Sequence, residues 1–239
     1  MRIDSKKFAK FFPDPENSKE DLVAMGGDFS SERLYYAYMH GIFPWDDNPI
    51  LWYSPDPRAI FDIPTFHISR TVKRKIKKKL FRITFNQAFR DVMIGCSFRI
   101  MEPTWITKGF IKGYTKFHEQ GYAHSVEAWN ANGELVGGVY GVAIGRFFSG
   151  ESMFVKESDA GKIALTYLFN ALEKDGFTLF DSQVINETTA SLGAYEISKT
   201  TYLQKLKEAV KVPYKWDPPK VEEVEEFLFN KLKHSPESI

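Results

Sequence analysis

The strongest constraint on the fold is the order of strand and helix patterns that begins at Phe81. The strand patterns alternate apolar with polar residues or are largely apolar, whereas the helix patterns carry an apolar stripe every three or four residues. Two of the strand patterns flank Asn132-Gly133, a dipeptide typical of tight hairpin turns. The series reads β-α-α-β-β-β-α-β and predicts an α+β domain with a mixed sheet and flanking helices. The patterns cover 81–85, 86–96, 106–120, 123–145 (two strands), 146–154, 157–176 and 177–184, and a further helix is predicted at 198–210.

The first 62 residues differ from the rest because they are rich in proline, aspartate and aromatic residues. One helix is predicted at 31–40, with Ser30 or Ser31 as its cap and Gly41 at its end. The residues after it contain four prolines and are expected to be rigid loop. We therefore predict a small N-terminal domain over 1–62 and a second domain over 63–239, whose tail from Pro213 onward forms a peripheral helix.

Cysteine usage and hydropathy exclude several classes of protein. Cys96 is the only cysteine, so neither an intrachain disulfide nor a cysteine-based zinc site can form. The first twelve residues lack the apolar stretch of a signal peptide, and the most apolar run (136–145) has about half the length of a membrane helix. The five histidines show no metal-binding spacing, and His124 is expected to be a hydrogen-bonded core residue. These features predict a cytoplasmic protein with no metal and no membrane contact.

The charge is distributed unevenly along the chain. The formal net charge is +1, but residues 70–82 (RTVKRKIKKKLFR) hold eight basic residues and no acid. The remainder carries 24 basic against 31 acidic residues. Such a run is either the solvated face of a helix or a contact for a polyanion, because clustered Lys and Arg release counterions when they meet phosphates.

The element order resembles that of the GNAT superfamily of N-acetyltransferases, which suggests acyl transfer by the domain over 63–239. Those enzymes hold the pyrophosphate of coenzyme A on a glycine-rich loop that opens a helix. The corresponding stretch here, 154–165, has one glycine (Gly161) and two acids (Glu157 and Asp159) that would repel a pyrophosphate. The sequence therefore argues against coenzyme A, and no cofactor is expected.

Ten short motifs carry a more specific resemblance. The strings GGDFS, GIFPW, ILWYSPDPR, HISR, TWIT, HEQGYAHSVE, VGGVYGVAIG, GESMF, DSQV and TASLGAYEI occur in this order between residues 26 and 197. Together they resemble the leucyl/phenylalanyl-tRNA–protein transferase family. The resemblance implies a bacterial enzyme that moves Leu or Phe from aminoacyl-tRNA to the N-terminal Arg or Lys of a protein. The modified protein is thereby marked for degradation through the N-degron pathway. The expected partners are charged tRNA and such acceptor proteins, and the enzyme is expected to be a monomer.

The resemblance also implies roles for individual residues. Asp181 would polarise Gln183, whose carbonyl oxygen accepts a hydrogen bond from the acceptor amine, while Glu151 and Asp181 receive the cationic acceptor residue. Trp45 and Trp105 would flank the terminal adenosine. Val139, where the family often has Met, belongs to an apolar pocket for the donor side chain. The other implied substrate-binding residues are Tyr114, Phe148, Met153, Leu168 and Asn186, and the implied tRNA-binding residues are Arg70, Lys73, Arg74, Lys75, Lys77, Lys78 and Lys79.

Residue patterns alone leave other interpretations open. Asp181 and Gln183 lie two apart in a strand pattern, so their side chains should share a face, but a strand-end Asp can also cap a loop. Glu151 lies in an apolar strand pattern and needs a partner, which an internal salt bridge would supply. The apolar residues of the implied pocket would otherwise be plain core. A coenzyme A-dependent N-acetyltransferase and a non-catalytic RNA-binding module remain the alternatives.

Overall fold

The computed structural model describes residues 6–98 and 105–234, which form two sheets and the helices that cover them. The strands are β1 (Leu22–Met25), β2 (Phe43–Asp47), β3 (Ile50–Tyr53), β4 (Arg58–Phe61), β5 (Arg82–Phe85), β6 (Ala123–Trp129), β7 (Leu135–Ile144), β8 (Phe147–Val155), β9 (Leu179–Gln183) and β10 (Tyr195–Ile197). The α-helices are α1 (Ser31–Met39), α2 (Arg70–Lys77), α3 (Phe89–Ser97), α4 (Lys108–Glu119), α5 (Ala160–Lys174), α6 (Glu187–Ser191), α7 (Lys199–Val210) and α8 (Val221–His234). Short 3-10 segments occupy Lys6–Lys10, Pro15–Asn17 and Ile63–Thr65.

The larger sheet has seven strands in the order β10-β4-β9-β8-β7-β6-β5. Among the described strands, β8 and β9 pair in parallel, and every other pair is antiparallel. The segment from β5 to β9 follows the predicted order β-α-α-β-β-β-α-β, and Gly133 takes a φ of 77° in the β6–β7 turn. The predicted fold class, an α+β arrangement with a mixed sheet and flanking helices, is confirmed.

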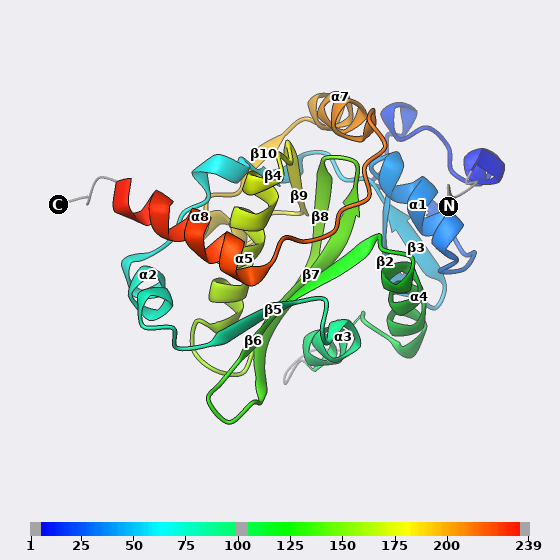
Figure 1. Cartoon of the computed structure of the whole chain (residues 1–239). Helices are drawn as coiled ribbons and strands as arrows, with labels where there is room; N and C mark the ends of the chain where they lie inside the picture. Colours follow the sequence, from blue (N-terminus) through cyan, green and yellow to red (C-terminus); the bar gives the residue numbers. More distant parts are fainter. Residues whose placement is uncertain (1–5, 99–104, 235–239) are drawn as a thin grey trace.

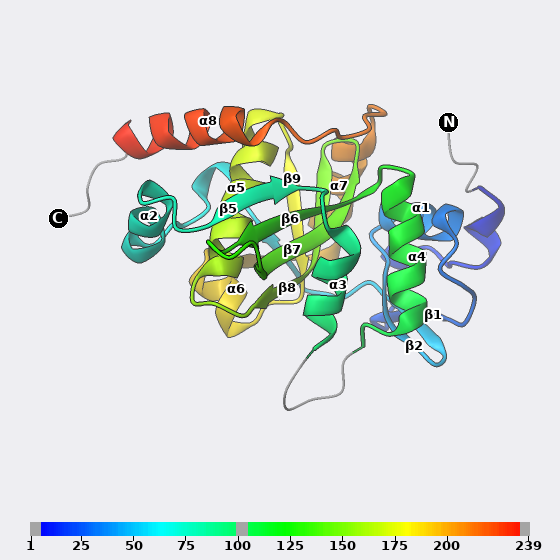
Figure 2. The same ribbon diagram turned by 60° about the horizontal axis from the view of Figure 1, so that its bottom comes forward.

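Helices cover both faces of this sheet and create two hydrophobic cores (Figures 1 and 2). On one face, α5 packs across the central strands beneath α8, with apolar residues such as Leu168 and Leu228 almost fully buried. On the other face, α3 and α4 cover the sheet and α1 lies beyond them, with Phe110 and Leu34 among the buried residues. In the described part of the chain, no helix is both long and apolar enough to span a membrane.

The second sheet has the order β1-β3-β2 and belongs to the N-terminal segment. The expectation that the residues after α1 are loop was wrong, because β2, β3 and β4 all lie there. Pro44 is compatible with β2 because β2 is an edge strand, where a missing N–H does not break a ladder. The strand β4 joins the larger sheet between β10 and β9. The division into domains at residue 62 stays a prediction.

Candidate active site

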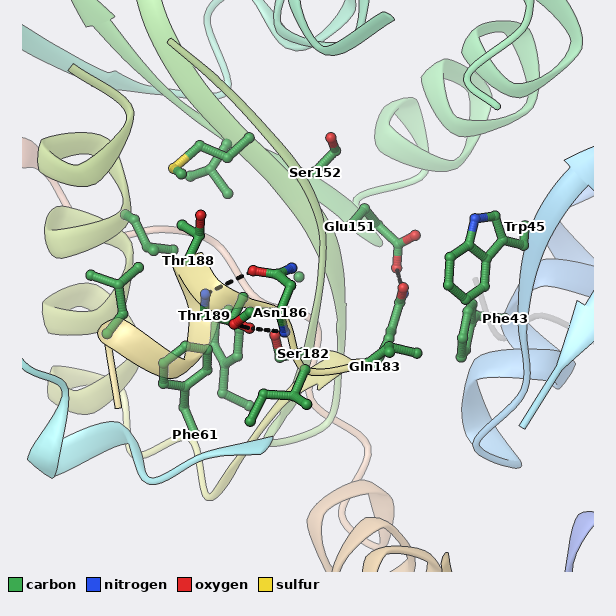
Figure 3. Close-up of a pocket in the computed structure, with 18 of the residues that line it drawn as sticks. Phe43, Trp45, Phe61, Glu151, Ser152, Ser182, Gln183, Asn186, Thr188 and Thr189 are labelled. Carbon is green, nitrogen blue, oxygen red and sulfur yellow. Dashed lines mark hydrogen bonds between the residues drawn. The ribbon is translucent and has the colours of Figure 1, made fainter. Parts of the chain in front are cut away.

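A pocket of about 680 Å³ opens beside the parallel strand pair. Pairing between β8 and β9 ends at Ser149 and Asp181, and residues just beyond these positions line the pocket. The opposite wall comes from β2 of the smaller sheet, which carries Trp45, and the far end comes from the start of α6 (Figure 3). The pocket therefore lies where the two sheets meet.

Three of the residues that line this pocket occupy irregular positions in their strands. The pairing of β7 with β8 passes from Gly150 to Ser152 and skips Glu151. In the same way, the β4–β9 register skips Ser182 and the β2–β3 register skips Trp45. A β-bulge of this kind bends the strand and redirects a side chain, and bulges are common beside active sites. Each bulge here presents its extra residue to the pocket.

Glu151 is the buried acid of the pocket, with 9% of its surface exposed. Its Oε1 accepts hydrogen bonds from Ser149 Oγ at 3.0 Å and from Gln183 Nε2 at 2.9 Å. Its Oε2 has no hydrogen-bond partner among the described residues. Burial raises the pKa of Glu151 to about 7, although the Tyr38, Ser149 and Gln183 side chains lower it in part. The internal salt bridge considered for Glu151 is not found in the described part of the chain. The Oε2 atom is itself buried, and the Tyr38 side chain lies near the carboxylate.

Asp181 is fully buried and does not line the pocket. Its carboxylate accepts from Arg58 Nε at 2.9 Å and Nη2 at 2.7 Å, and from the Tyr202 hydroxyl at 2.8 Å. It touches Gln183 through the backbone N–H of that residue, at 2.8 Å, and not through the side chain. The simple alternation expected for DSQV ends at the bulge, since both Ser182 and Gln183 line the pocket.

The apolar end of the pocket contains only part of the set implied by the family motifs. Val139 and Met153 line it, whereas Phe148 and Leu168 do not. Phe148 stacks on Phe180 with ring centroids 5.4 Å apart, and Leu168 is enclosed in the core beneath α8. The apolar lining residues that the sequence analysis did not select include Phe61, Leu165, Phe180 and Leu192. Leu165 lies about one helical turn before Leu168, so both belong to the apolar stripe of α5. The stripe alone does not show which of the two lines the pocket.

Of the three aromatic residues that the family motifs implied for substrate binding outside the apolar end, two line the pocket and one does not. Trp45, which is 40% exposed, and Trp105 both line the pocket. Tyr114 is completely buried, and its hydroxyl is hydrogen-bonded to that of Tyr38. Asn186 lines the pocket and also caps α6, because its side chain accepts from Thr189 N at 2.9 Å. Tyr114 is therefore a core residue that does not line the pocket, whereas the two tryptophans and Asn186 do.

The basic run forms α2, the turn after it and, at Arg82, the first residue of β5, with Val72 and Ile76 buried. Two of its lysines bind internal acids, since Lys75 Nζ lies 2.7 Å from Asp159 Oδ2 and Lys79 Nζ lies 2.9 Å from Glu225 Oε2. Lys73 and Lys75 are half-buried. The exposed cations of the run are Arg70, Arg74, Lys77, Lys78, Lys79 and Arg82. The run therefore combines lysines that dock α2 on α5 and α8 with cations that face outward.

His124 is buried against Trp216, and Asn86 Nδ2 lies 3.1 Å from its Nδ1. Burial lowers the pKa of His124 to about 3. The imidazole is therefore neutral at physiological pH and has the core position expected from the sequence.

Comparison with known proteins identifies the family. The family profile for leucyl/phenylalanyl-tRNA protein transferase matches residues 60–207, and the profile for the N-terminal domain of the same family matches residues 27–56. The transferase of this name from Maridesulfovibrio salexigens is 46% identical over 209 residues, which cover 84% of this chain and 87% of the relative. The one from an Enterobacter species is 50% identical over 200 residues, which cover 82% and 85% of the two chains.

A solved structure shows a much weaker likeness. The glucosamine N-acetyltransferase region of a fungal β-N-acetylglucosaminidase matches with a TM-score of 0.45 and 12% identity, over 76% of this chain and 24% of that one. A likeness of this strength supports no conclusion about function. The extended matches to the two bacterial relatives do, and the chain therefore belongs to the leucyl/phenylalanyl-tRNA protein transferase family, whose members are aminoacyl-tRNA-dependent aminoacyltransferases.

Proposed function

We propose that this protein transfers leucine or phenylalanine from aminoacyl-tRNA to the N-terminal Arg or Lys of acceptor proteins. The observation that carries the proposal is the buried Glu151 carboxylate, whose Oε2 lacks a described partner inside a pocket with one apolar end. Burying an unpaired acceptor is costly, so a ligand with a cationic donor complements it. An acceptor residue with an α-amine and a basic side chain is such a ligand.

The donor end of the pocket suits the aminoacylated end of a tRNA. Its volume of about 680 Å³ is within the range of small-molecule sites, so it can hold a nucleoside with its amino acid but not the body of a tRNA. Trp45 and Trp105 offer ring faces for the terminal adenosine, and stacking on an aromatic side chain contributes about 1–3 kcal/mol per base. Val139, Met153 and Leu165 offer an apolar surface to a leucine or phenylalanine side chain.

The proposed chemistry is aminolysis of the aminoacyl ester. The neutral α-amine of the acceptor attacks the ester carbonyl, a C–N bond forms, and the bond from that carbon to the 3′-terminal ribose oxygen breaks. The proton lost by the amine finally resides on the released ribose hydroxyl. Since a free α-amine has a pKa near 7.7–8, a fraction of it is already neutral at pH 7. Orientation of the two reactants can supply about 7–11 kcal/mol of the barrier reduction.

Gln183 and Glu151 are the residues that we assign to the acceptor. Gln183 Nε2 donates to Glu151, so its amide oxygen is left to accept from the attacking amine. Glu151 Oε2 would bind the positive charge of the acceptor residue. Asp181 acts indirectly in this scheme, because its carboxylate is occupied by Arg58, Tyr202 and the Gln183 backbone.

The direct test combines purified protein, charged leucyl- or phenylalanyl-tRNA and a peptide that begins with Arg. Mass spectrometry should detect one added Leu or Phe without ATP, metal or coenzyme A, and RNase pretreatment should abolish the product. A matched peptide that begins with Ala should remain unmodified. Gln183→Ala should lower the transfer rate while leaving tRNA binding near normal. Transfer from acetyl-coenzyme A and none from charged tRNA would overturn the proposal.

The same scheme extends to the biological role. A leucine or phenylalanine added at the N-terminus would mark the acceptor for degradation through the N-degron pathway. The proposed location is the bacterial cytoplasm, where charged tRNA is made, and the proposed form is a monomer. In cells, a reporter with N-terminal Arg should become longer-lived when this gene is deleted, whereas a reporter with N-terminal Leu should not.

A further inference from the structure

A buried arginine, Arg58, is linked to Gln183 through the carboxylate of Asp181. Arg58, at the start of β4, is 1% exposed and forms a two-pronged ion pair with the fully buried Asp181. Its Nη1 also donates to the Gly41 carbonyl at 3.1 Å. The guanidinium lies between two rings, 4.7 Å from the centroid of Phe43 and 4.4 Å from that of Tyr202. These contacts fix both its position and its orientation.

The Asp181 carboxylate connects Arg58 to Gln183, which lines the pocket. Its Oδ1, which accepts from Arg58 Nε, also accepts from the backbone N–H of Gln183. An aspartate that binds the N–H two residues ahead closes a local turn. Gln183 at this turn has a φ of 64°, a left-handed conformation that is uncommon for residues other than glycine. Backbone strain of this kind persists where the surrounding structure enforces it.

We propose that Arg58 is a positioning residue for the transfer reaction: by clamping Asp181 it holds Gln183 in the left-handed turn that directs its side-chain amide to Glu151. This inference rests on the proposed function. It makes Arg58 and Tyr202 part of the support for the acceptor site, although neither lines the pocket. The alternative is that the ion pair only stabilises the junction between β4 and β9.

The geometry favours arginine at this position over any other cation. Only a planar guanidinium can donate two parallel hydrogen bonds to one carboxylate, a third to a carbonyl, and still stack on aromatic rings. Lysine retains the charge but donates from a single point. Arg58→Lys should therefore keep the buried pair neutral overall while leaving the carboxylate free to rotate.

Tyr202→Phe is the milder test because it removes one hydroxyl from a buried ring without creating a cavity. It deletes the 2.8 Å bond to Asp181 Oδ2 and the 3.3 Å bond from Arg58 Nη2. Its matched control is Tyr167→Phe, which removes a hydroxyl bonded to Glu225 on α8, away from the pocket. We expect Tyr202→Phe to lower kcat severalfold with the KM for charged tRNA unchanged, and Tyr167→Phe to leave both unchanged.

A double-mutant comparison separates positioning from simple structural support. Arg58→Lys should lower kcat by about tenfold or more in the wild-type background, since small displacements of a positioned group are costly. In the Gln183→Ala background it should change kcat by less than about twofold, because the group that it positions is gone. Equal losses in both backgrounds would mean that the pair is only structural.

The outcomes also separate this inference from the proposed function. If the wild-type protein transfers Leu or Phe but both Tyr202→Phe and Arg58→Lys keep full kcat, the positioning role is overturned and the function stands. If the wild-type protein transfers nothing from charged tRNA, the function fails and the inference fails with it. If Arg58→Lys does not fold, the comparison of Tyr202→Phe with Tyr167→Phe is the test. A lower kcat for Tyr202→Phe alone supports the positioning role, and an equal kcat for the two variants overturns it.

Discussion

The side-chain amide of Gln183 donates to Glu151 Oε1 over 2.9 Å, and both side chains line the pocket (Figure 3). The donated hydrogen bond leaves the Gln183 amide oxygen as one acceptor, and Glu151 Oε2, which is buried and has no hydrogen-bond partner among the described residues, is a second. A protonated or neutral amine has enough N–H donors to bind both. The contact between these two residues therefore prepares the site for an amine.

Transfer should depend on the ionisation of Glu151. Because burial raises the pKa of Glu151 to about 7, the carboxylate loses its charge as the pH falls through that value, and attraction of a cationic acceptor is lost with it. The ratio of kcat/KM between wild type and Glu151→Gln, measured with an Arg-initiated peptide, should increase from pH 6 to pH 8. Titration of the peptide amine affects both proteins equally and cancels in the ratio. A ratio that does not vary with pH would show that the charge of Glu151 is not used.

The same residue should make the fold less stable at high pH. Its folded-state pKa is raised, so the folded protein binds the extra proton, and stability is lost as the pH rises from the unfolded value toward about 7. A shift from 4.5 to about 7 corresponds to roughly 3 kcal/mol at most. Relative to wild type, Glu151→Gln should therefore gain free energy of unfolding between pH 5 and pH 8 in urea titrations. A constant difference across this range would contradict the raised pKa.

The outward cations of the basic run should bind tRNA phosphates. Replacing Lys77 and Lys78 by Ala should raise the KM for charged tRNA and reduce the slope of log affinity against log salt by about 1 per lost phosphate contact. Transfer from a minimal aminoacyl-adenosine donor should not change. Lys75→Ala is the matched comparison, since Lys75 is bound to Asp159 and should contribute less to tRNA affinity. If transfer from charged tRNA and transfer from aminoacyl-adenosine fall by the same factor, the basic run has a structural role.

Trp45 should contribute to donor binding. Its ring is 40% exposed and packs edge-on against Tyr53 with centroids 5.7 Å apart, so its removal leaves the core intact. Trp45→Ala should weaken binding of aminoacyl-adenosine by about 1–3 kcal/mol, and Trp45→Phe should recover part of this loss. The check is the KM for the minimal donor together with the melting temperature. An unchanged KM would exclude stacking on Trp45.

Donor selectivity should follow the residues that line the pocket. Val139→Met shortens the apolar end and should move the kcat/KM ratio from Phe toward Leu, within the about 1–3 kcal/mol by which such pockets discriminate. Leu165→Ala should also change the ratio, because Leu165 lines the pocket. Leu168→Ala should instead cost about 2–5 kcal/mol of stability with the ratio unchanged, because Leu168 is enclosed in the core. A shift of the ratio by Leu168→Ala alone would contradict this arrangement.

Local patterns predicted most of the larger sheet and the helices on it. The Asn132-Gly133 pair correctly located the β6–β7 hairpin, where Gly133 has the positive φ and Asn130 N donates to Glu134 O to close the turn. The strands β2 and β3 were not predicted because prolines interrupt the strand pattern of this segment. Pro44 lies in the edge strand β2 and Pro49 in the turn before β3, where the missing N–H breaks no ladder.

The site was less predictable because it depends on contacts between distant residues. Sequence motifs selected Asp181, but the partner that occupies its carboxylate, Arg58, is 123 positions earlier in the chain. Strand alternation placed Asp181 and Gln183 on one face, whereas the bulge at Ser182 and the positive φ of Gln183 break that alternation. The apolar stripe of α5 could not show that Leu165 faces the pocket while Leu168 faces the core.

The three skipped positions, Trp45, Glu151 and Ser182, have a consequence for how this pocket can change during evolution. A residue that belongs to no ladder pair can be exchanged without disturbing the pairs on either side. Gly150 and Ser152 pair with Gly141 and Tyr140, which are adjacent in β7. Deletion of Glu151 would make Gly150 and Ser152 adjacent as well, so the pairing of β7 with β8 would become regular. The sheet therefore does not require these residues, and substrate preference can drift at all three while the surrounding architecture stays the same.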